Sequence, residues 1–156
     1  HVTANLKEIE NQMTENFSPC PQTQWLKSLP GVGEMLAVVI WTEIGAIERF
    51  SRAERLASYC GLVWRQDSSG GKIRLGPVRR DVNVYLKWAF VEAANSALLN
   101  AERCGYGHIH RLYQRIKSRR GHGKAKVAVA RHLSEASFWM LTKGEPYREP
   151  VSSTQR

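Results

Sequence analysis

Apolar residues recur at helical spacing along most of the chain. In residues 4–15, Leu6, Ile9 and Met13 fall on one face of a helix. This stripe is too narrow to form a core of its own. The segment is therefore either a peripheral helix of the domain or the end of a coiled-coil arm. The spacing predicts further helices over residues 25–29, 34–44, 52–59, 81–100, 108–119 and 124–141.

Glycines and capping residues mark the ends of these helices. Gly45 and Gly61 follow two of them, and Ser51 with Glu54 predicts a capping box at the start of another. The pattern predicts an all-α, compact helical domain. We assign residues 1–20 to the end of a coiled-coil linker or a peripheral helix, 21–145 to the helical domain, and 146–156 to a tail.

Residues 61–80 differ from the rest of the chain because they are rich in glycine and in basic side chains. Residues 72–75 alternate polar and apolar positions, so a short strand or one arm of a hairpin is possible there. Five cations stand against the single acid Asp67, namely Arg65, Lys72, Arg74, Arg79 and Arg80. This segment is the one basic Ser/Gly-rich loop of an otherwise helical chain.

The charge balance indicates an acidic partner. The 156 residues carry a formal net charge of +9, which favours nucleic acid over the rarer anionic membrane surface. The longest apolar stretch, residues 35–41, is too short to span a bilayer. Cys20, Cys60 and Cys104 show no CxxC spacing, which argues against a disulfide framework or zinc site and favours a reducing, cytoplasmic setting.

The first motif is Leu29-Pro30-Gly31-Val32-Gly33, which lies between two predicted helices and resembles a helix-hairpin-helix. Glycines let the backbone approach a phosphate, and the amides at the start of the next helix attract an anion. Such contacts position a DNA duplex without reading its sequence. The alternative is a tight turn without a ligand.

The second motif is Ser68-Ser69-Gly70-Gly71. A serine attacks a phosphate when its hydroxyl is exposed and when cations stabilise the negative charge that develops. The flanking glycines would give exposure, and the five cations of residues 61–80 would supply the positive field. From composition alone, a basic loop that only clamps DNA explains these residues at least as well.

A third group is the basic run around Gly121-His122-Gly123. It includes Arg115, Arg119 and Lys124, and no acid occurs between Arg103 and Glu135. This run predicts a stripe that follows a phosphate backbone. The pair His108 and His110 does not share a helix face, and the carboxylates are scattered, so no metal site is predicted within this sequence.

Several motifs in the same order resemble one family. They are residues 29–33, Phe50 with residues 56–62, residues 68–72, and residues 85–94 (Tyr-Leu-Lys-Trp-Ala-Phe-Val-Glu-Ala-Ala). Together they resemble the C-terminal, catalytic-serine domain of the Piv-like, bridge-RNA-guided insertion-sequence transposases. One departure is Arg80-Asp81-Val82-Asn83, where many relatives carry a Lys-x-Gly-Asn-like run.

The resemblance implies a serine nucleophile that forms a covalent link to DNA during recombination. It maps onto Ser69, with Ser68 as the adjacent alternative. It also implies an N-terminal RuvC-like domain with an acidic set that binds Mg²⁺. We expect that domain to lie upstream of His1, because the sequence begins without methionine and lacks clustered acids. Implied partners are double-stranded DNA, a bridge RNA and further copies of the chain, in a bacterial or archaeal cytoplasm and associated with the nucleoid.

The leading hypothesis is thus a domain of a site-specific DNA transposase or recombinase, inactive in isolation. The alternative is a non-enzymatic helix-hairpin-helix module that only binds DNA. A third class, a metalloprotein using the histidines, is not favoured. We predict the following DNA-contacting residues: Pro30, Gly31, Gly33, Arg65, Gly70, Lys72, Arg74, Arg79, Arg80, Asn83, Lys87, Arg115, Arg119 and Lys124.

Overall fold

The computed structural model describes residues 8, 20–63, 65–69, 72–76 and 82–150, with 65–69 and 72–76 described by their backbone. Apart from Glu8, the predicted helix over residues 4–15 lies outside the described residues, as do Gly70, Arg79 and Arg80. In chain order the elements are α2 (Pro21–Lys27), α3 (Glu34–Ile44), a 3₁₀ turn η1 (Ile47–Arg49), α4 (Ala53–Tyr59), β1 (Arg65–Ser69), β2 (Lys72–Gly76), α5 (Val84–Leu99), α6 (Ala101–Cys104), α7 (Gly107–Arg120) and α8 (His122–Lys143).

The helical class predicted from the sequence is confirmed. The helix predicted over residues 34–44 matches α3 at both ends. The segment predicted as a basic Ser/Gly-rich loop holds a pair of short antiparallel strands, β1 and β2, so it is more regular than a loop. The alternation of residues 72–75 was the sequence signal for this pairing.

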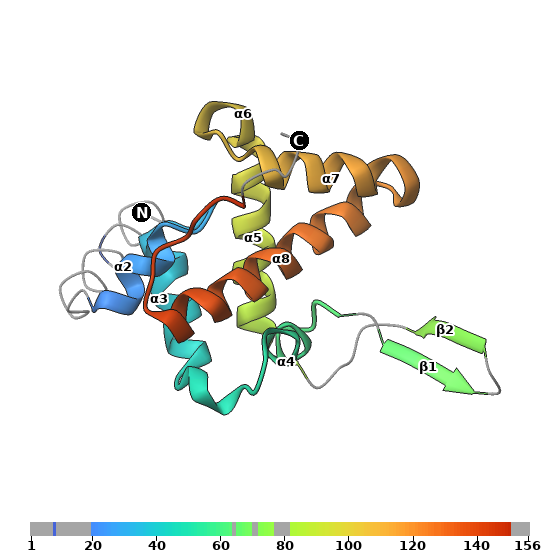
Figure 1. Cartoon of the computed structure of the whole chain (residues 1–156), viewed down its shortest axis with the longest axis horizontal. Helices are drawn as coiled ribbons and strands as arrows, with labels where there is room; N and C mark the ends of the chain where they lie inside the picture. The colour runs from blue at the N-terminus through green and yellow to red at the C-terminus, as the bar shows by residue number, and fades with distance from the viewer. Residues whose placement is uncertain (1–7, 9–19, 64, 70–71, 77–81, 151–156) are drawn as a thin grey trace, which may run out of the picture.

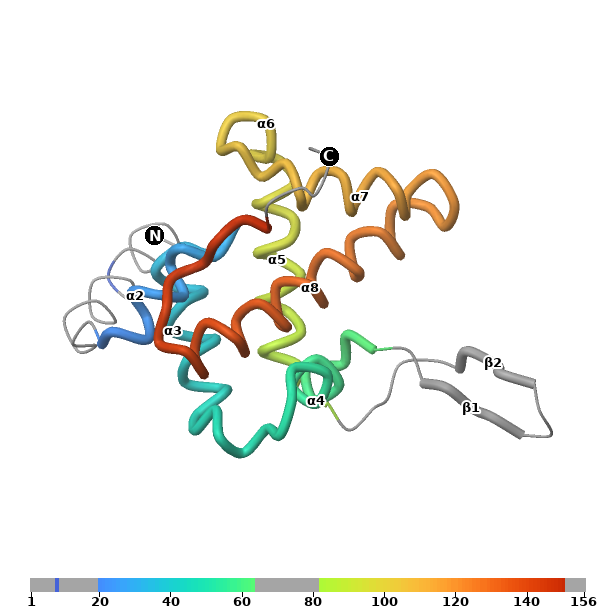
Figure 2. The backbone as a smooth tube through the Cα atoms, in the orientation of Figure 1, coloured from blue at the N-terminus to red at the C-terminus, as the bar shows by residue number. Residues whose placement is uncertain are grey.

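Helix α8 is the central element of the fold. It packs against α4, α5 and α7, and α3 packs against α2 and α5. Figure 1 shows α8 crossing α5 obliquely, with α4 below the crossing and α7 above it. The tube in Figure 2 shows the segment after α8 returning upward past α2 and α3. The end of α4 and the start of α5 flank the segment that carries the two serines. In this arrangement both helix ends contact the same core.

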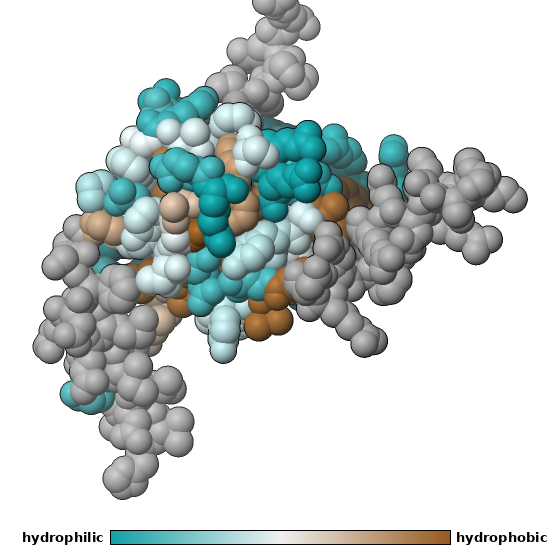
Figure 3. Space-filling view, turned by 90° about the horizontal axis from the view of Figure 1, so that it is seen from below, coloured by the Kyte–Doolittle hydropathy of each residue, from teal (hydrophilic) through white to brown (hydrophobic). Residues whose placement is uncertain are grey.

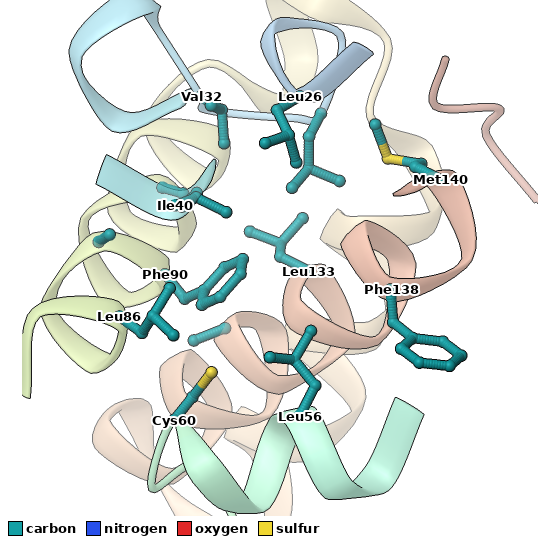
Figure 4. Close-up of a cluster of buried hydrophobic side chains, with 14 of the residues drawn as sticks. Leu26, Val32, Ile40, Leu56, Cys60, Leu86, Phe90, Leu133, Phe138 and Met140 are labelled. Carbon is teal, nitrogen blue, oxygen red and sulfur yellow. The ribbon is translucent and has the colours of Figure 1, made fainter. Parts of the chain in front are cut away.

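The core forms because apolar residues repeat every three or four positions on α5 and α8. Phe90 of α5 and Leu133 of α8 are fully buried, as are Leu26 of α2 and Leu56 of α4. Figure 4 shows these four side chains pointing toward one another from their separate helices. Burying each such side chain contributes roughly 1.5–3 kcal/mol. From below, polar residues cover most of the described surface and brown apolar areas are small (Figure 3).

Most helix starts differ from the prediction, and the largest shift is in α2, which begins at Pro21 rather than at residue 25. Helix α4 begins at Ala53 after an extended Arg52 and has no side-chain cap, so the capping box predicted for Ser51 and Glu54 is wrong. Helix α5 begins at Val84 rather than at 81, because the Asn83 side chain caps it by accepting a hydrogen bond from the backbone N–H of Leu86 at 2.9 Å.

Residues 145–150 follow α8 without helical structure and contact other elements. The backbone N–H of Tyr147 donates to Ser28 Oγ at 2.7 Å, next to the end of α2. The Glu149 carboxylate accepts from the backbone N–H of His108 at 2.6 Å, in the first turn of α7. A carboxylate there complements the positive end of the helix. The described part of the segment predicted as a tail is thus tied to the domain.

No described helix is both long enough and apolar enough to cross a membrane.

Candidate nucleic-acid interface and serine hairpin

The two serines lie at the end of strand β1, immediately before the turn that leads into β2. Strand β1 pairs with β2 in antiparallel register, with Ser69 opposite Lys72, Ser68 opposite Ile73 and Asp67 opposite Arg74. Successive residues of a strand belong to opposite faces, and directly paired residues belong to the same face. One face of the ribbon therefore holds Ser69 with Arg65, Asp67, Lys72 and Arg74. The other face holds Ser68 with Gln66, Ile73 and Leu75.

The chain on either side of this hairpin is fixed to α4. The backbone N–H of Asn83 donates to the carbonyl of Tyr59 at 2.9 Å, so the residue before α5 is bonded to the last residue of α4. Gly61 has φ +67°, and a Cβ at this position would come within 2.9 Å of the Val82 side chain. A residue larger than glycine at position 61 would push the chain there away from Val82. The glycine preserves both the left-handed turn and the close approach.

Asn83 is the centre of a small polar cluster. Besides capping α5, its Nδ2 donates to Glu43 Oε2 at 2.6 Å and to Tyr59 Oη at 3.3 Å. Arg49 donates to the carbonyl of Glu43 at 3.3 Å, and its guanidinium lies 4.6 Å from the centre of the Tyr59 ring. Hydrogen bonds from Asn83 and then from Arg49 lower the pKa of the Tyr59 phenol. The cluster joins α3, α4 and α5 beside the ends of the hairpin segment.

This use of Asn83 was not predicted. The sequence pattern placed Asn83 among the DNA contacts, and the structure engages both its Oδ1 and its Nδ2 within the chain. Glu43, Arg49 and Tyr59 were not singled out at all. The available signal for Asn83 was its position directly before an apolar helix, which is typical of an N-cap.

The turn between α2 and α3 is packed against α5. Pro30 is buried, and a Cβ on Gly31 would lie 2.0 Å from the carbonyl oxygen of Ala93 and 2.7 Å from the backbone nitrogen of Ala97. Gly31 also has φ +78°. By contrast, Gly33 is exposed, a Cβ on it would meet no other atom within 4 Å, and it precedes the first turn of α3. Among Pro30, Gly31 and Gly33, it is Gly33 whose backbone is exposed to solvent.

The basic run extends over the second half of α7 and the first turn of α8. Arg111, Arg115 and Arg119 are exposed and recur every four residues, so they lie on one face of α7 about 6 Å apart along its axis. Lys124 is exposed in the first turn of α8, beyond Gly121 at φ +82°. Arg131 is different, since its Nε donates to Glu135 Oε1 at 2.8 Å. The exposed stripe thus ends before Arg131.

The histidines are distributed over separate contacts. His108 and His132 have ring centres 4.8 Å apart, and His122 Nδ1 is hydrogen-bonded to Tyr113 Oη at 2.7 Å. His132 Nε2 is buried without a hydrogen-bond partner. Burial first, and then the neighbouring His108, lowers the pKa of His132. Among the described residues no three His, Cys, Asp or Glu side chains come together to hold a metal ion.

The three cysteines also lie apart. Cys60 is buried at the end of α4, and burial raises its thiol pKa to about 12, so it is a core residue rather than a nucleophile. Lys87, another predicted DNA contact, is half-buried in the first turns of α5. The structure thus brings Ser69, Lys72 and Arg74 together on one ribbon face, while Arg115, Arg119 and Lys124 form a separate basic surface.

Comparison with known proteins identifies the family. Residues 23–110, more than half of the chain, match the model of the Transposase IS116/IS110/IS902 family. The chain belongs to this family. The matched range runs from α2 through the serine hairpin and α5 into the start of α7.

Individual relatives agree with this assignment. The chain is 33% identical over 125 residues to the transposase for insertion sequence element IS1111A of Coxiella burnetii, covering 80% of this chain and 34% of that protein. It is 26% identical to a putative transposase of Sinorhizobium fredii, over 99% of this chain and 40% of that protein. An insertion element IS110 protein of Streptomyces coelicolor is 32% identical, over 90% and 34% respectively. The chain therefore spans between about a third and two fifths of the length of these relatives.

Proposed function

We propose that this chain is the DNA-binding and strand-transfer domain of a site-specific DNA transposase, with Ser69 as the nucleophile. The observation that carries the proposal is the register of the hairpin. It assigns Ser69 to the same ribbon face as Arg65, Lys72 and Arg74 and sets it directly opposite Lys72. A hydroxyl among cations is the arrangement that attack on a phosphodiester requires, because negative charge grows on the phosphate in the transition state.

The same register favours Ser69 over Ser68. Ser68 belongs to the face that carries Ile73 and Leu75, and none of the residues on that face of the two described strands is basic. A phosphate approaching that face would meet apolar positions instead of cations. The mapping of the nucleophile by family resemblance and the placement by register therefore point to the same residue by independent arguments.

In the proposed step, a phosphoryl transfer, one phosphodiester bond is exchanged for another, so the energy of the phosphodiester bond is retained. The Ser69 Oγ forms a bond to the phosphorus, and one bridging P–O bond of the DNA breaks. The serine proton passes to a base, and the departing DNA oxygen leaves as a hydroxyl after taking up a proton. One phosphodiester replaces another, so the step is reversible and a second DNA hydroxyl can attack the phosphoserine link to rejoin a different strand.

We further propose that DNA is held by surfaces outside the hairpin. The exposed arginines of α7 and Lys124 of α8 would contact successive phosphates, as cations spaced along one helix face do. The exposed start of α3 after Gly33 would contribute backbone amides to a phosphate. Pro30 and Gly31 would act indirectly, by holding α3 against α5, since Pro30 is buried and Gly31 abuts Ala93 and Ala97.

The whole transposase would include a RuvC-like domain that binds Mg²⁺, and it would be guided by a bridge RNA in a complex with several copies of the chain. The greater length of the relatives leaves room for such a domain. We place the residues that would bind Mg²⁺ in that RuvC-like domain. The isolated chain is expected to bind DNA and to carry out little or no strand transfer.

Covalent capture tests the proposal. The complete transposase, with target DNA, is expected to form a denaturant-resistant protein–DNA adduct. Ser69→Ala should abolish the adduct and leave DNA affinity within about twofold, because a single hydroxyl contributes little to binding. Ser68→Ala is the matched control and should leave the adduct. Loss of the adduct in Ser68→Ala alone would move the nucleophile by one residue, and an adduct in both variants would show that Ser69 is not the required nucleophile.

A further inference from the structure

The outward face of α5 carries a stripe that has no partner within the described part of the chain. Tyr85, Trp88, Glu92, Asn95 and Leu99 recur at alternating spacings of three and four residues, which places them in one line along the helix. The apolar members are well exposed, with Tyr85 at 64%, Trp88 at 49% and Leu99 at 86% of their full surface. We call these five residues the α5 stripe.

The Leu99 end of the stripe borders a groove of about 570 Å³ between α5 and α7. From α5 it is lined by Leu98 and Leu99 and also by Glu92 and Asn95 of the stripe, and the facing wall includes the polar side chains of His110 and Tyr113. The opposite end of the stripe holds the large exposed ring of Trp88. The stripe thus carries an exposed apolar ring toward one end and, toward the other, a hollow with both leucine and polar walls, and two such features can meet across a twofold axis.

We propose that the α5 stripe is the contact between two copies of this chain, which pair antiparallel about a twofold axis that passes between Glu92 and Asn95. In this register Trp88 of one copy faces Leu99 and the adjoining groove of the other. Glu92 faces Asn95, whose amide can donate to the carboxylate. By symmetry each of these two pairings occurs twice, so four matched contacts form from one stripe.

Charge selects this pairing over the other arrangements of the same stripe. A parallel pair would set Glu92 against Glu92 and leave both grooves empty. An antiparallel pair shifted to centre on Glu92 would also juxtapose the two carboxylates. Like charges opposed at a desolvated contact are unfavourable, whereas a carboxylate and an amide are complementary.

The same residues argue against nucleic acid as the occupant. Tyr85 and Trp88 could stack unpaired bases, as exposed aromatic rings do in single-strand-binding proteins. The middle of the stripe, however, presents the carboxylate of Glu92, which accepts a hydrogen bond from Asn95 at 3.4 Å. The exposed arginine stripe lies on α7, not on this face of α5. A second protein surface fits the stripe better than a polyanion does.

The inference is tested on the 156-residue chain by sedimentation over a wide range of protein concentration. The wild-type chain should reversibly form dimers. Trp88→Ala and Leu99→Gln should each weaken the dimer about thirtyfold or more, as removal of a central anchor does. Trp139→Ala is the matched control, because Trp139 is 53% exposed on α8, away from the stripe, and this variant should dimerise like the wild type.

Disulfide trapping tests the register. Cys104 is exposed, so all variants are made in a chain that carries Cys104→Ser. A mixture of Glu92→Cys and Asn95→Cys chains should crosslink more than either variant alone. Crosslinking of Glu92→Cys alone would overturn the antiparallel register. A chain that stays monomeric at every concentration, dimers that survive both Trp88→Ala and Leu99→Gln, or a monomer that needs Trp88 to bind an unpaired oligonucleotide would overturn the inference itself.

The dependence of affinity on salt concentration distinguishes the proposed dimer contact from DNA binding. Each copy carries a net charge of +9, so screening should strengthen a dimer formed mainly by apolar contacts. DNA binding through phosphates should weaken under the same change. The dimer does not depend on Ser69, so its failure would leave the proposed nucleophile untouched, and the reverse also holds.

Discussion

At the scale of single residues, the glycines of the α2–α3 turn have unequal roles. The motif Pro30–Gly33 was predicted from sequence as a phosphate-binding turn, yet Gly31 is fixed by its contact with α5. The contact is possible because Ala93 and Ala97 are small and because glycine tolerates φ +78°. Sequence alone could not separate the two glycines, since their difference depends on which helix lies beside the turn.

Gly31→Ala is predicted to destabilise the domain by roughly 2–4 kcal/mol, since the added Cβ meets the backbone of α5 and the left-handed conformation becomes strained. Gly33→Ala should change stability by less than about 1 kcal/mol, because φ there is −92° and the space is open. Urea unfolding of both variants measures the difference. Equal losses in the two variants would contradict the packing described for Gly31.

His132 is predicted to make stability depend on pH. Its pKa is lowered in the folded chain by burial and by His108, with Glu135 and Glu149 acting in the opposite direction. The unfolded chain therefore binds a proton first as the pH falls below about 6.5. Stability is fully present above that pH and is lost as the pH falls through the folded-state pKa.

His132→Gln should accordingly flatten the fall in melting temperature between neutral and mildly acidic pH, while the wild type loses stability over the same range. His110→Gln serves as the control, because His110 makes only a long contact with Gln114, at 3.4 Å. An unchanged pH profile in His132→Gln would show that its depressed pKa is not the source of the acid sensitivity.

At the scale of elements, helix positions were largely predictable and helix boundaries were not. The apolar period located α3, α5, α7 and α8 because each buries one face in the shared core. The start of α5 was misjudged because its cap, Asn83, is held in place by contacts with residues that are distant in the sequence. Asn83 reaches Glu43, forty positions away in the sequence, and no local pattern encodes that bond.

Asn83→Ala is predicted to lower the free energy of unfolding by about 2–3 kcal/mol, since it removes the cap of α5 and leaves Glu43 without its amide donor. Arg55→Ala, at an exposed position of α4, should cost less than about 0.5 kcal/mol. Thermal or chemical unfolding compares them. A loss in Asn83→Ala as small as in Arg55→Ala would show that the cluster does not anchor the hairpin segment.

The basic surface of α7 predicts how the affinity for DNA changes with salt concentration. Arg115→Ala and Arg119→Ala should each reduce the slope of log affinity for DNA against log salt by about 0.9, and their effects should add. The loss should be similar for unrelated DNA sequences, because phosphate contacts carry no sequence information. Arg148→Ala is a suitable control, since Arg148 is paired with Glu145 in the segment after α8. An unchanged slope in both α7 variants would place DNA elsewhere.

At the scale of the whole molecule, sequence supplied the helical class, the expectation of an acidic partner and the order of motifs that marks the family. It could not weigh Ser68 against Ser69 by composition, because both precede glycines within one basic segment. The strand register assigns the two serines to opposite faces of the ribbon, since a shift of one residue moves a side chain to the opposite face, and our proposal of Ser69 rests on that difference. It also could not foresee the α5 stripe as a surface, because an exposed apolar residue is recognised only once the core is known.

The antiparallel pairing proposed for α5 has a consequence for the assembled molecule. The starts of the two α5 helices, which follow the two hairpin segments in the chain, would lie about 30 Å apart along the paired helices, given a rise of about 1.5 Å per residue. Two serines would then belong to one dimer. Exchange of two DNA strands needs at least two nucleophiles, so the dimer would supply the minimum set.

Mass mapping of the covalent link tests the central claim most directly. The complete transposase is trapped on DNA, denatured, and digested with nuclease and protease, and the peptide that retains a nucleotide is fragmented. We predict a phosphodiester link on Ser69 Oγ, with the peptide spanning Arg65 to Lys72 and no modified peptide in Ser69→Ala. A nucleotide on Ser68, or on any residue outside this hairpin, would contradict the assignment.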